Sequence, residues 1–234
     1  MRFTLKYILI FGLSALSLHG VERQFCVLAP YGSQGLKDLG YLNGDSEFQK
    51  LKWGQQRRSP LFVAPGNAAL TLVKPVLNEE GKTLYQPVVN LPWPGDSDLA
   101  LFVVVVIEGK DTPLVFGLDD RFDTFPKNTL KVLNGLNQTI YALAGERKFQ
   151  LSPSGSSKAF STEAYQVIDK VLEEDEEAVP NPGMPIAVGV EANGVYDLIY
   201  AAGISISPDS RVLCLVLPPK KEGSTRYQAR IVLD

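Results

Sequence analysis

Histidine is almost absent from this sequence of 234 residues. The single histidine, His19, lies in the opening stretch MRFTLKYILIFGLSALSLHG, which has the features of a signal peptide. If this stretch is removed, the mature chain has no imidazole. That excludes Ser-His-Asp and Cys-His catalysis and any metal site that needs histidine ligands. The chemistry that remains open uses carboxylates, lysines or metals bound through oxygen.

Long hydrophobic runs are also missing. Arg2 and Lys6 form a basic head, and the uncharged, mostly apolar run from Tyr7 to Leu18 is shorter than the roughly 20 residues that a membrane-spanning helix needs. We therefore expect residues 1–20 to be a signal peptide, cleaved between residues 17 and 24. The mature protein is expected in the periplasm or outside the cell, soluble and without a stable membrane anchor. An uncleaved anchor or a buried first strand is the alternative.

Cysteine is scarce, with Cys26 near the expected mature N-terminus and Cys214 in the apolar run RVLCLVLPP. An even number of cysteines in an exported chain permits a disulfide. Two unpaired, buried thiols that pack as small hydrophobic groups are the alternative, and the sequence leaves both open. There is no CxxC motif and no glycine-rich loop for phosphate, so no cofactor is expected.

Positive charge is neither abundant nor clustered. The chain has 23 basic and 26 acidic residues, for a net charge of −3. Adjacent basic residues such as Arg57/Arg58 and Lys220/Lys221 do not join into a stripe that could neutralise phosphates, so nucleic acid is not an expected partner.

Short apolar runs between Gly, Pro, Asn and Asp turns dominate the chain after the leader, which predicts an all-β protein. The unbroken run Leu99–Ile107 predicts a central strand with both faces buried. The segment AVGVEANGVYDLIYAAG predicts a hairpin with a type I′ turn at Asn193–Gly194. In this hairpin, Val188 and Val190 should face one way and Glu191 the other.

One segment departs from the β pattern. In STEAYQVIDKVLEEDEEAVP, Ile168, Val171 and Leu172 recur at helical spacing, and Ser161 or Thr162 could cap the start. We expect one short helix within residues 161–177. An edge strand is the alternative, because apolar and polar residues also alternate there.

The two halves of the chain share a pattern. LPWPGDSDLALFVVV at 91–105 resembles ISISPDSRVLCLVLP at 204–218, an alignment that sets Asp96 against Asp209. Each is preceded by a segment that we interpret as a hairpin, PLFVAPGNAALTL and PIAVGVEANGVYDL. We predict two immunoglobulin-like or β-sandwich units, residues 21–118 and 119–234, consistent with an internal duplication. Chance similarity between turn-then-strand segments is the alternative.

Residues 120–234 also resemble a loose group of uncharacterised exported bacterial β-sandwich proteins. The resemblance implies an exported, sandwich-like protein, and its motifs are structural. It is carried by Phe125, Pro126, Asn134, Pro153, Gly155 and Arg211.

Carboxylates gather in GLDDRFDTFP, where Asp119, Asp120 and Asp123 surround Arg121. Two carboxylates across a cleft could hydrolyse a glycosidic bond, and carboxylate oxygens could bind calcium. The commoner arrangement is a turn in which aspartates cap backbone N–H groups and pair with the arginine. No residue is assigned a catalytic, cofactor-binding or metal-binding role.

Trp53 and Trp93 could stack on sugar rings if exposed, or pack in the core. The sequence favours an exported, non-catalytic structural or protein-interaction module of the cell envelope, with unidentified protein partners. A polysaccharide-binding β-sandwich module is the alternative, and a carboxylate-dependent glycosidase is less favoured.

Overall fold

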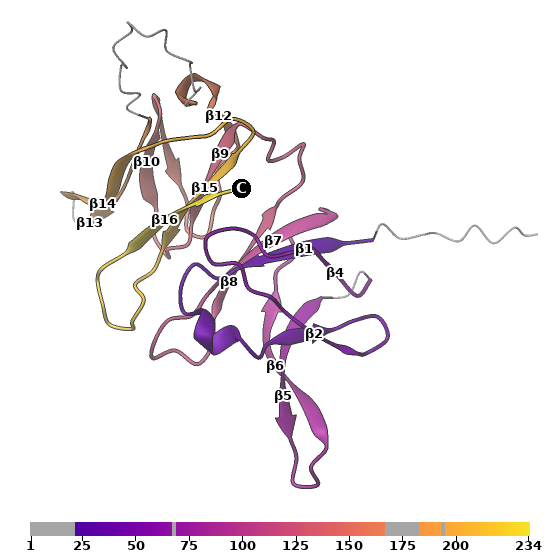
Figure 1. Cartoon of the computed structure of the whole chain (residues 1–234). Coiled ribbons are helices and arrows are strands. Elements are labelled where there is room, and N and C mark those ends of the chain that lie inside the picture. The colour runs from indigo at the N-terminus through magenta and orange to yellow at the C-terminus, as the bar shows by residue number, and fades with distance from the viewer. Residues whose placement is uncertain (1–21, 67–68, 167–182, 193–194) are drawn as a thin grey trace, which may run out of the picture.

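The computed structural model of the protein describes residues 22–66, 69–166, 183–192 and 195–234. These residues form four sheets of four strands each, which make up two sandwich-like units. The predicted all-β class with two sandwich units is therefore confirmed. Figure 1 shows the first unit in indigo to magenta and the second in pink through orange to yellow.

The first unit contains an inner and an outer sheet. The inner sheet has the order β4-β1-β7-β8, with the strands β1 (Gln24–Leu28), β4 (Phe62–Val63), β7 (Leu99–Val105) and β8 (Leu114–Asp119). The outer sheet has the order β3-β2-β5-β6, with β2 (Gly40–Leu42), β3 (Phe48–Lys50), β5 (Leu70–Leu77) and β6 (Thr83–Leu91). A 3₁₀ turn, η1 (Ser33–Leu36), precedes β2.

The second unit repeats this arrangement. Its inner sheet has the order β12-β9-β15-β16, with β9 (Thr129–Asn134), β12 (Phe160–Ser161), β15 (Arg211–Leu217) and β16 (Gln228–Leu233). Its outer sheet has the order β11-β10-β13-β14, with β10 (Ile140–Ala144), β11 (Arg147–Leu151), β13 (Met184–Ala192) and β14 (Val195–Ile204). Each strand of the first unit has a counterpart in the second whose number is higher by eight, and the order of the strands in the sheets is the same.

Details of strand pairing also recur. The central pair of each inner sheet, β1/β7 and β9/β15, is parallel, whereas both sheets of an immunoglobulin domain are antiparallel. In each inner sheet a serine hydroxyl accepts a backbone N–H bond from the central strand: Ser59 from Val27 at 2.8 Å and Ser157 from Val132 at 2.9 Å. The two units are thus an internal structural repeat.

The alignment predicted from sequence is wrong by one residue. The predicted alignment matched Leu99 with Val212. In the structure, Leu99 pairs with Gln24, the first residue of β1, and Arg211 pairs with Thr129, the first residue of β9. Leu99 therefore corresponds to Arg211. A one-residue slip reverses every side chain in a strand, and only the corrected alignment keeps the same face of each strand in the sandwich core.

The hairpin predicted in PLFVAPGNAALTL is also wrong. β4 pairs with β1 of the inner sheet and β5 belongs to the outer sheet, so the two strands do not pair with each other. The counterpart of the β13–β14 pair is β5–β6, because each contains the same register shift.

Three hydrophobic layers hold the four sheets together. One lies inside each sandwich, and the third lies between the two inner sheets. Along β7, Ala100 and Phe102 face the first sandwich, whereas Leu101 and Val103 face the second unit. The prediction of a central strand with both faces buried is confirmed, because residues from Ala100 to Val105 are fully buried.

Residues of two predicted elements fall outside the described ranges. Of the predicted helix at 161–177, residues up to 166 are described, and they contain β12 and a 3₁₀ turn, η2 (Glu163–Tyr165). The strands of the predicted hairpin are confirmed, with Val188 and Val190 buried and Glu191 exposed. Its turn residues, 193–194, lie outside the described residues.

Candidate functional site

The loop GLDDRFDTFP places its aspartates in separate environments. Asp119 accepts hydrogen bonds from Ser97 Oγ at 2.8 Å and from Arg121 Nη2 at 2.7 Å. The hydrogen-bonded Arg121 guanidinium is the main reason that the pKa of Asp119 lies well below its usual range. Asp123 is 71% exposed and lies 3.7 Å from Arg121. Because its pKa is so low, Asp119 is ionised at neutral pH and cannot act as a general acid.

Asp120 belongs to a buried ion-pair network. Its two carboxylate oxygens accept hydrogen bonds from Nε and Nη2 of Arg58, both at 2.8 Å. Arg211 donates to the backbone carbonyl of Asp120 at 3.1 Å, and both arginines lie 2.8 Å from the Asp234 carboxylate. The network therefore joins Arg58 of the first unit to Arg211 and Asp234 of the second.

Aromatic contacts complete this junction. The guanidinium groups of Arg58 and Arg211 each lie 5.5 Å from the centre of the buried Phe125 ring, and Lys131 Nζ lies 5.0 Å from it. Burial lowers the pKa of Lys131. The geometry supports the turn interpretation of the loop rather than a glycosidase centre, because Asp119 and Asp120 are engaged in structural contacts.

Both tryptophans contribute to the core of the first unit. The indole N–H of Trp53 donates to the Leu36 carbonyl at 2.8 Å. Trp93 donates to the Ser97 carbonyl at 2.5 Å, and its ring packs edge-on against Phe25 and Phe102. The proposed role of these tryptophans as an exposed sugar-binding platform is not supported by this arrangement.

The two cysteines are free and buried. Cys26 lies in the layer between the units and Cys214 in the core of the second sandwich, so the inner sheet of the second unit separates them. The disulfide that the sequence left open is not formed. Burial raises the pKa of Cys26 to about 11 and that of Cys214 to about 12, which makes both thiols poor nucleophiles.

The outer face of the second unit holds an open hollow of about 620 Å³. Small residues of β13, Ala187 and Gly189, form its floor. Tyr141 and Leu143 of β10 border the floor on one side, and Leu198 of β14 borders it on the other. Gly189 has no room for a side chain, because a Cβ there would lie 2.8 Å from the Asp197 carbonyl oxygen. The hollow is therefore shaped by the choice of small residues along β13.

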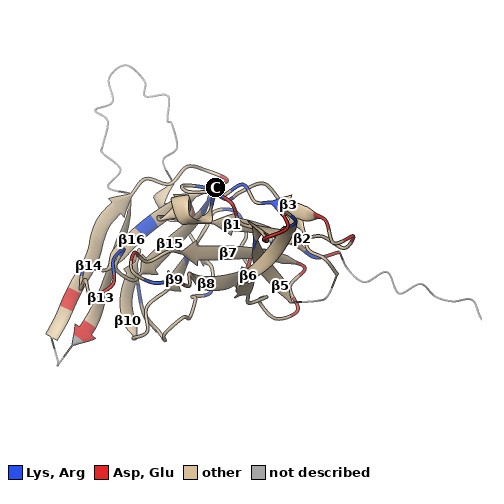
Figure 2. Ribbon diagram, turned by 90° about the horizontal axis from the view of Figure 1, so that it is seen from below, with Lys and Arg blue, Asp and Glu red and all other residues tan. Residues whose placement is uncertain are grey.

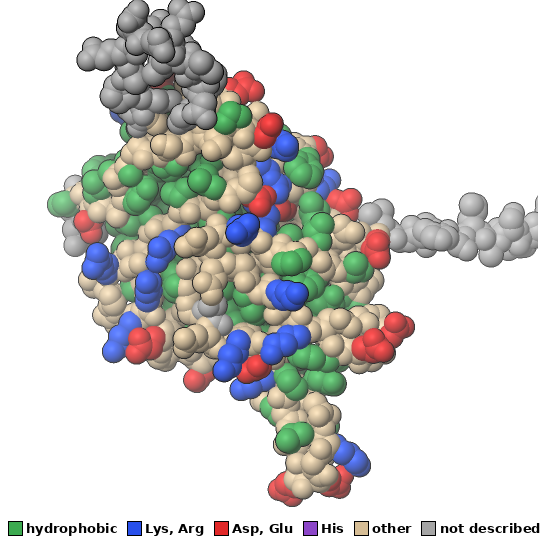
Figure 3. All heavy atoms as spheres, viewed as in Figure 1, with side chains coloured by type: hydrophobic (Ala, Val, Ile, Leu, Met, Phe, Trp, Pro, Cys, Tyr) green, Lys and Arg blue, Asp and Glu red, His purple; other side chains and the backbone are tan. Residues whose placement is uncertain are grey.

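Large hydrophobic side chains stand exposed beside this hollow. Tyr196 and Leu198, which line the hollow, are each 64% exposed. Hydrophobic side chains gather in the region of β14 (Figure 3). In Figure 2, β13 and β14 carry charge only near one end, where Glu191 and Asp197 lie. Large exposed apolar side chains grouped in this way mark a binding face more often than scattered ones do.

Two tyrosines and a glutamate contact one another at one end of the hollow. Tyr141 donates its hydroxyl proton to Glu191 at 2.7 Å and meets Tyr196 edge-on, with ring centres 5.0 Å apart. The hydrogen bond to Glu191 is the main cause that raises the pKa of Tyr141 to about 12. Gln150 and Lys148 of β11 line the hollow beside Tyr141 and Leu143, their partners on β10. The hollow thus combines an apolar floor with a few polar groups at its margin, as ligand sites do.

Sequence reasoning missed this site. The alternation in AVGVEANGVYDLIYAAG identified the strands but did not assign their outward residues a role. A signal was present, because β14 carries Tyr196, Leu198 and Ala201 at exposed positions where a solvated strand would carry polar residues.

A scan against protein-family models and a search of curated proteins found no match. Within the described ranges, none of the helices has the length and apolar character that crossing a membrane requires. Among the same residues, no group of three or more histidine, cysteine, aspartate or glutamate side chains is placed to hold a metal ion.

Proposed function

We propose that this chain is an exported, non-catalytic interaction module of the cell envelope or exterior, and that the outer face of its second unit binds a protein partner. The observation that carries the proposal is the hollow of about 620 Å³ flanked by Tyr196 and Leu198, both 64% exposed. Exposing such side chains to water is unfavourable unless a partner covers them.

The roles of the loop aspartates support the non-catalytic part of the proposal. Asp119 and Asp120 are held by Arg121 and Arg58, and the lowered pKa of Asp119 keeps it ionised. The chain's one histidine lies in the expected leader. Export itself rests on the basic head and short apolar run of residues 1–18. It is tested by sequencing the N-terminus of the protein isolated from its native source: a start between residues 18 and 25 supports export, and a retained Met1 contradicts it.

Chemical cross-linking in native envelopes, followed by mass spectrometry, tests the binding face. Wild-type protein is compared with Leu198→Asp on β14 and with Leu84→Asp on β6, a matched control because Leu84 is a 52% exposed leucine on the outer sheet of the first unit. We expect Leu198→Asp to lose protein cross-links that wild type and Leu84→Asp retain. Equal cross-links from all three proteins would contradict the proposed face.

A second candidate is polysaccharide binding at the same hollow. It is favoured by Tyr141 and Tyr196 on an exposed face, with Lys148 and Gln150 as polar groups at the margin. Affinity electrophoresis against purified envelope polysaccharides distinguishes the candidates. Retardation of the wild type but not of Leu198→Asp would support the polysaccharide module and overturn the protein-binding proposal.

A further inference from the structure

One edge of the second outer sheet is formed by β14, the last strand in the order β11-β10-β13-β14. Its inner side pairs with β13, and no described strand pairs with its outer side. β14 lies at the margin of the molecule in both ribbon views (Figures 1 and 2). An edge strand presents a row of backbone N–H and C=O groups with which a further strand can pair.

The backbone groups of Tyr196 and Leu198 are directed to this edge. The Asp197 carbonyl between them points toward β13, because a Cβ at Gly189 of β13 would lie 2.8 Å from its oxygen. In a strand, the backbone groups of successive residues point to opposite sides. The two exposed residues that line the hollow therefore also present their N–H and C=O groups at the open edge.

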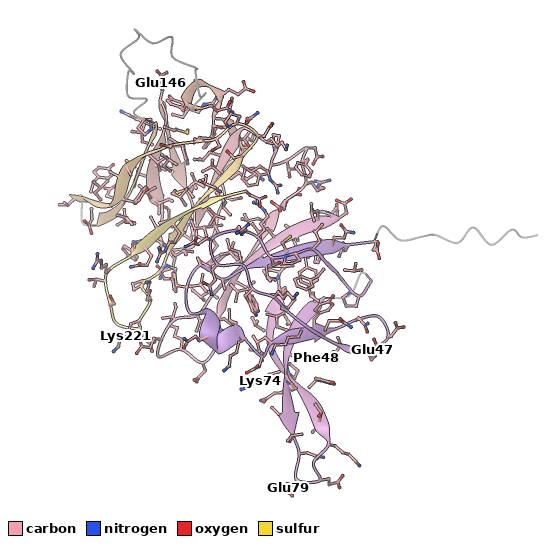
Figure 4. All side chains as sticks on the ribbon, viewed as in Figure 1. Glu47, Phe48, Lys74, Glu79, Glu146 and Lys221 are labelled. Carbon is pink, nitrogen blue, oxygen red and sulfur yellow. The ribbon has the colours of Figure 1, made fainter. Side chains whose placement is uncertain are left out.

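The equivalent edge of the first unit is blocked by a proline. This edge is β6, which belongs to the projecting hairpin with Glu79 at its turn (Figure 4). The two outer sheets contain the same register shift, next to which Val73 pairs with Pro87 and Gly189 pairs with Leu198. Pro87 is therefore the counterpart of Leu198. Proline has no N–H to donate, and in sheets it is found on edge strands with the missing N–H on the open side.

The remaining edge strands of the four sheets are short, charged or covered. β3 has three residues, and β4 and β12 have two each. β11 carries Arg147, β16 carries Arg230, and β8 lies against the Pro92 carbonyl at Gly117. By contrast, β14 has ten residues with no proline, lysine or arginine among them. The bulge that it contains is shared with β6, so the edge of β14 is the least protected of the eight.

We propose that a partner polypeptide binds in extended conformation alongside β14 and continues the outer sheet of the second unit as a fifth strand. This inference rests on the proposed function and specifies how the partner is held. The partner backbone exchanges hydrogen bonds with Tyr196 and Leu198. Its side chains on the outer face contact the exposed side chains of the same two residues, so the bound segment has apolar residues at alternate positions.

The hydrogen-bonding groups of the edge favour a strand over other occupants. An extended backbone carries N–H and C=O groups at the spacing of the edge, so each group gains a partner. A sugar or an apolar small molecule over β14 would cover backbone groups that it cannot pair in register, and a buried unpaired backbone group is unfavourable. Asp197 is the only charged residue of β14, so little charge is buried when a strand is added.

Modified peptides test the inference on the wild-type protein. The probe is a synthetic peptide of a sequence selected on this protein from a phage-displayed library of random peptides. Each backbone amide of the peptide is methylated in turn, and binding is titrated. We expect methylation at alternate positions to weaken binding by about tenfold or more, because only every second N–H faces β14. Equal effects at neighbouring positions, or failure to select any peptide, would overturn the inference.

Two substitutions at position 198 separate the backbone from the side chain. Leu198→Ala and Leu198→Pro both remove the leucine side chain, but only proline also removes the N–H, as Pro87 does in the first unit. We expect Leu198→Pro to bind the peptide about tenfold more weakly than Leu198→Ala. Leu84→Asp is the control and should bind like wild type. Circular dichroism establishes that each variant is folded, and equal affinities of folded Leu198→Pro and Leu198→Ala would contradict the added strand.

The outcomes distinguish this inference from the proposed function. If methylation shows no alternation but Leu198→Asp still loses its native protein cross-links, the binding face stands and its partner is held by side chains alone. If Leu198→Asp keeps its cross-links and no peptide is selected, both proposals fail. Size-exclusion chromatography with light scattering examines a second copy of this chain as the occupant. A wild-type dimer that Leu198→Pro dissociates would show that β14 pairs with itself and would overturn the partner strand.

Discussion

At the scale of single residues, Asp120 is held by a buried ion pair with Arg58. Its side chain is 3% exposed and that of Arg58 is 5% exposed, and two hydrogen bonds of 2.8 Å join them. Removing one partner of a buried ion pair leaves the other charge without compensation, which costs more than the pair contributes when intact. Asp120 is thus important for stability.

We predict that Arg58→Ala lowers the free energy of unfolding by about 3–5 kcal/mol, measured by urea denaturation. Lys50→Ala is the control, because the Lys50–Asp38 pair is largely exposed and should contribute less than about 1 kcal/mol. Equal effects of the two substitutions would show that the Arg58–Asp120 pair does not have the burial described.

The lowered pKa of Asp119 predicts a pH dependence. Because the folded-state pKa lies below the unfolded value of about 3.9, Asp119 adds stability above that pH and loses the contribution as the pH falls further. Between about pH 5 and pH 3, the urea midpoint of the wild type should fall more steeply than that of Asp119→Asn. Parallel pH profiles would contradict the ion pair with Arg121.

Both thiols should be inert in the folded protein. Cys26 and Cys214 are buried, and burial raises their pKa values to about 11 and about 12. We expect Ellman's reagent to modify neither cysteine in native protein and both after denaturation without reductant. A protein that yields no free thiol when denatured would instead contain the disulfide.

At the scale of secondary-structure elements, the repeat makes equivalent residues comparable. Ser59 and Ser157 each accept a backbone N–H bond from the central strand and donate to the next carbonyl at 2.8 Å. We predict that Ser59→Ala and Ser157→Ala each lower the free energy of unfolding by about 1–3 kcal/mol, because a buried N–H loses its acceptor. Thermal unfolding of the two variants measures this. A loss at one serine only would contradict their equivalence.

Strands could be predicted from sequence where the signal is local. The apolar run from Leu99 identified β7, and the alternation around Val188 identified β13, because burial of one or both faces dictates residue type along a strand. The assignment of strands to sheets was not predictable in this way. β4 has only two residues and joins the inner sheet, although the same apolar segment continues into β5 of the outer sheet.

The candidate site could not be predicted from the sequence either, because it too depends on which strands pair. The hollow exists because Tyr141, Gly189 and Leu198 lie side by side on three strands, and only the pairing register brings them together. The residues of a single strand do not show which residues of the neighbouring strands lie beside them.

At the scale of the whole molecule, the layer between the inner sheets couples the two units. It contains fourteen buried residues, including Leu101 of the first unit and Leu213 of the second. Either unit alone would expose this layer to water. The two sandwiches should therefore behave as one cooperative unit in folding.

This coupling can be measured because both tryptophans of the chain, Trp53 and Trp93, lie in the first unit. We predict that Leu213→Ala, a change in the second unit, lowers the free energy of unfolding by about 2–5 kcal/mol when followed by tryptophan fluorescence. The exposed Leu84→Ala is the control and should have little effect. A fluorescence midpoint that does not respond to Leu213→Ala would mean that the units unfold separately.

We propose that the outer face of the second unit, and not the equivalent face of the first, binds a partner. The most direct measurement replaces Tyr196 with a photo-cross-linking phenylalanine derivative. In a second protein it replaces Tyr85 in the same way, because Tyr85 corresponds to Tyr196 when the register shifts of β5–β6 and β13–β14 are aligned. After irradiation in native envelopes, we predict a discrete protein adduct from position 196 and none from position 85. Adducts from position 85 alone, or identical adducts from both positions, would contradict the account.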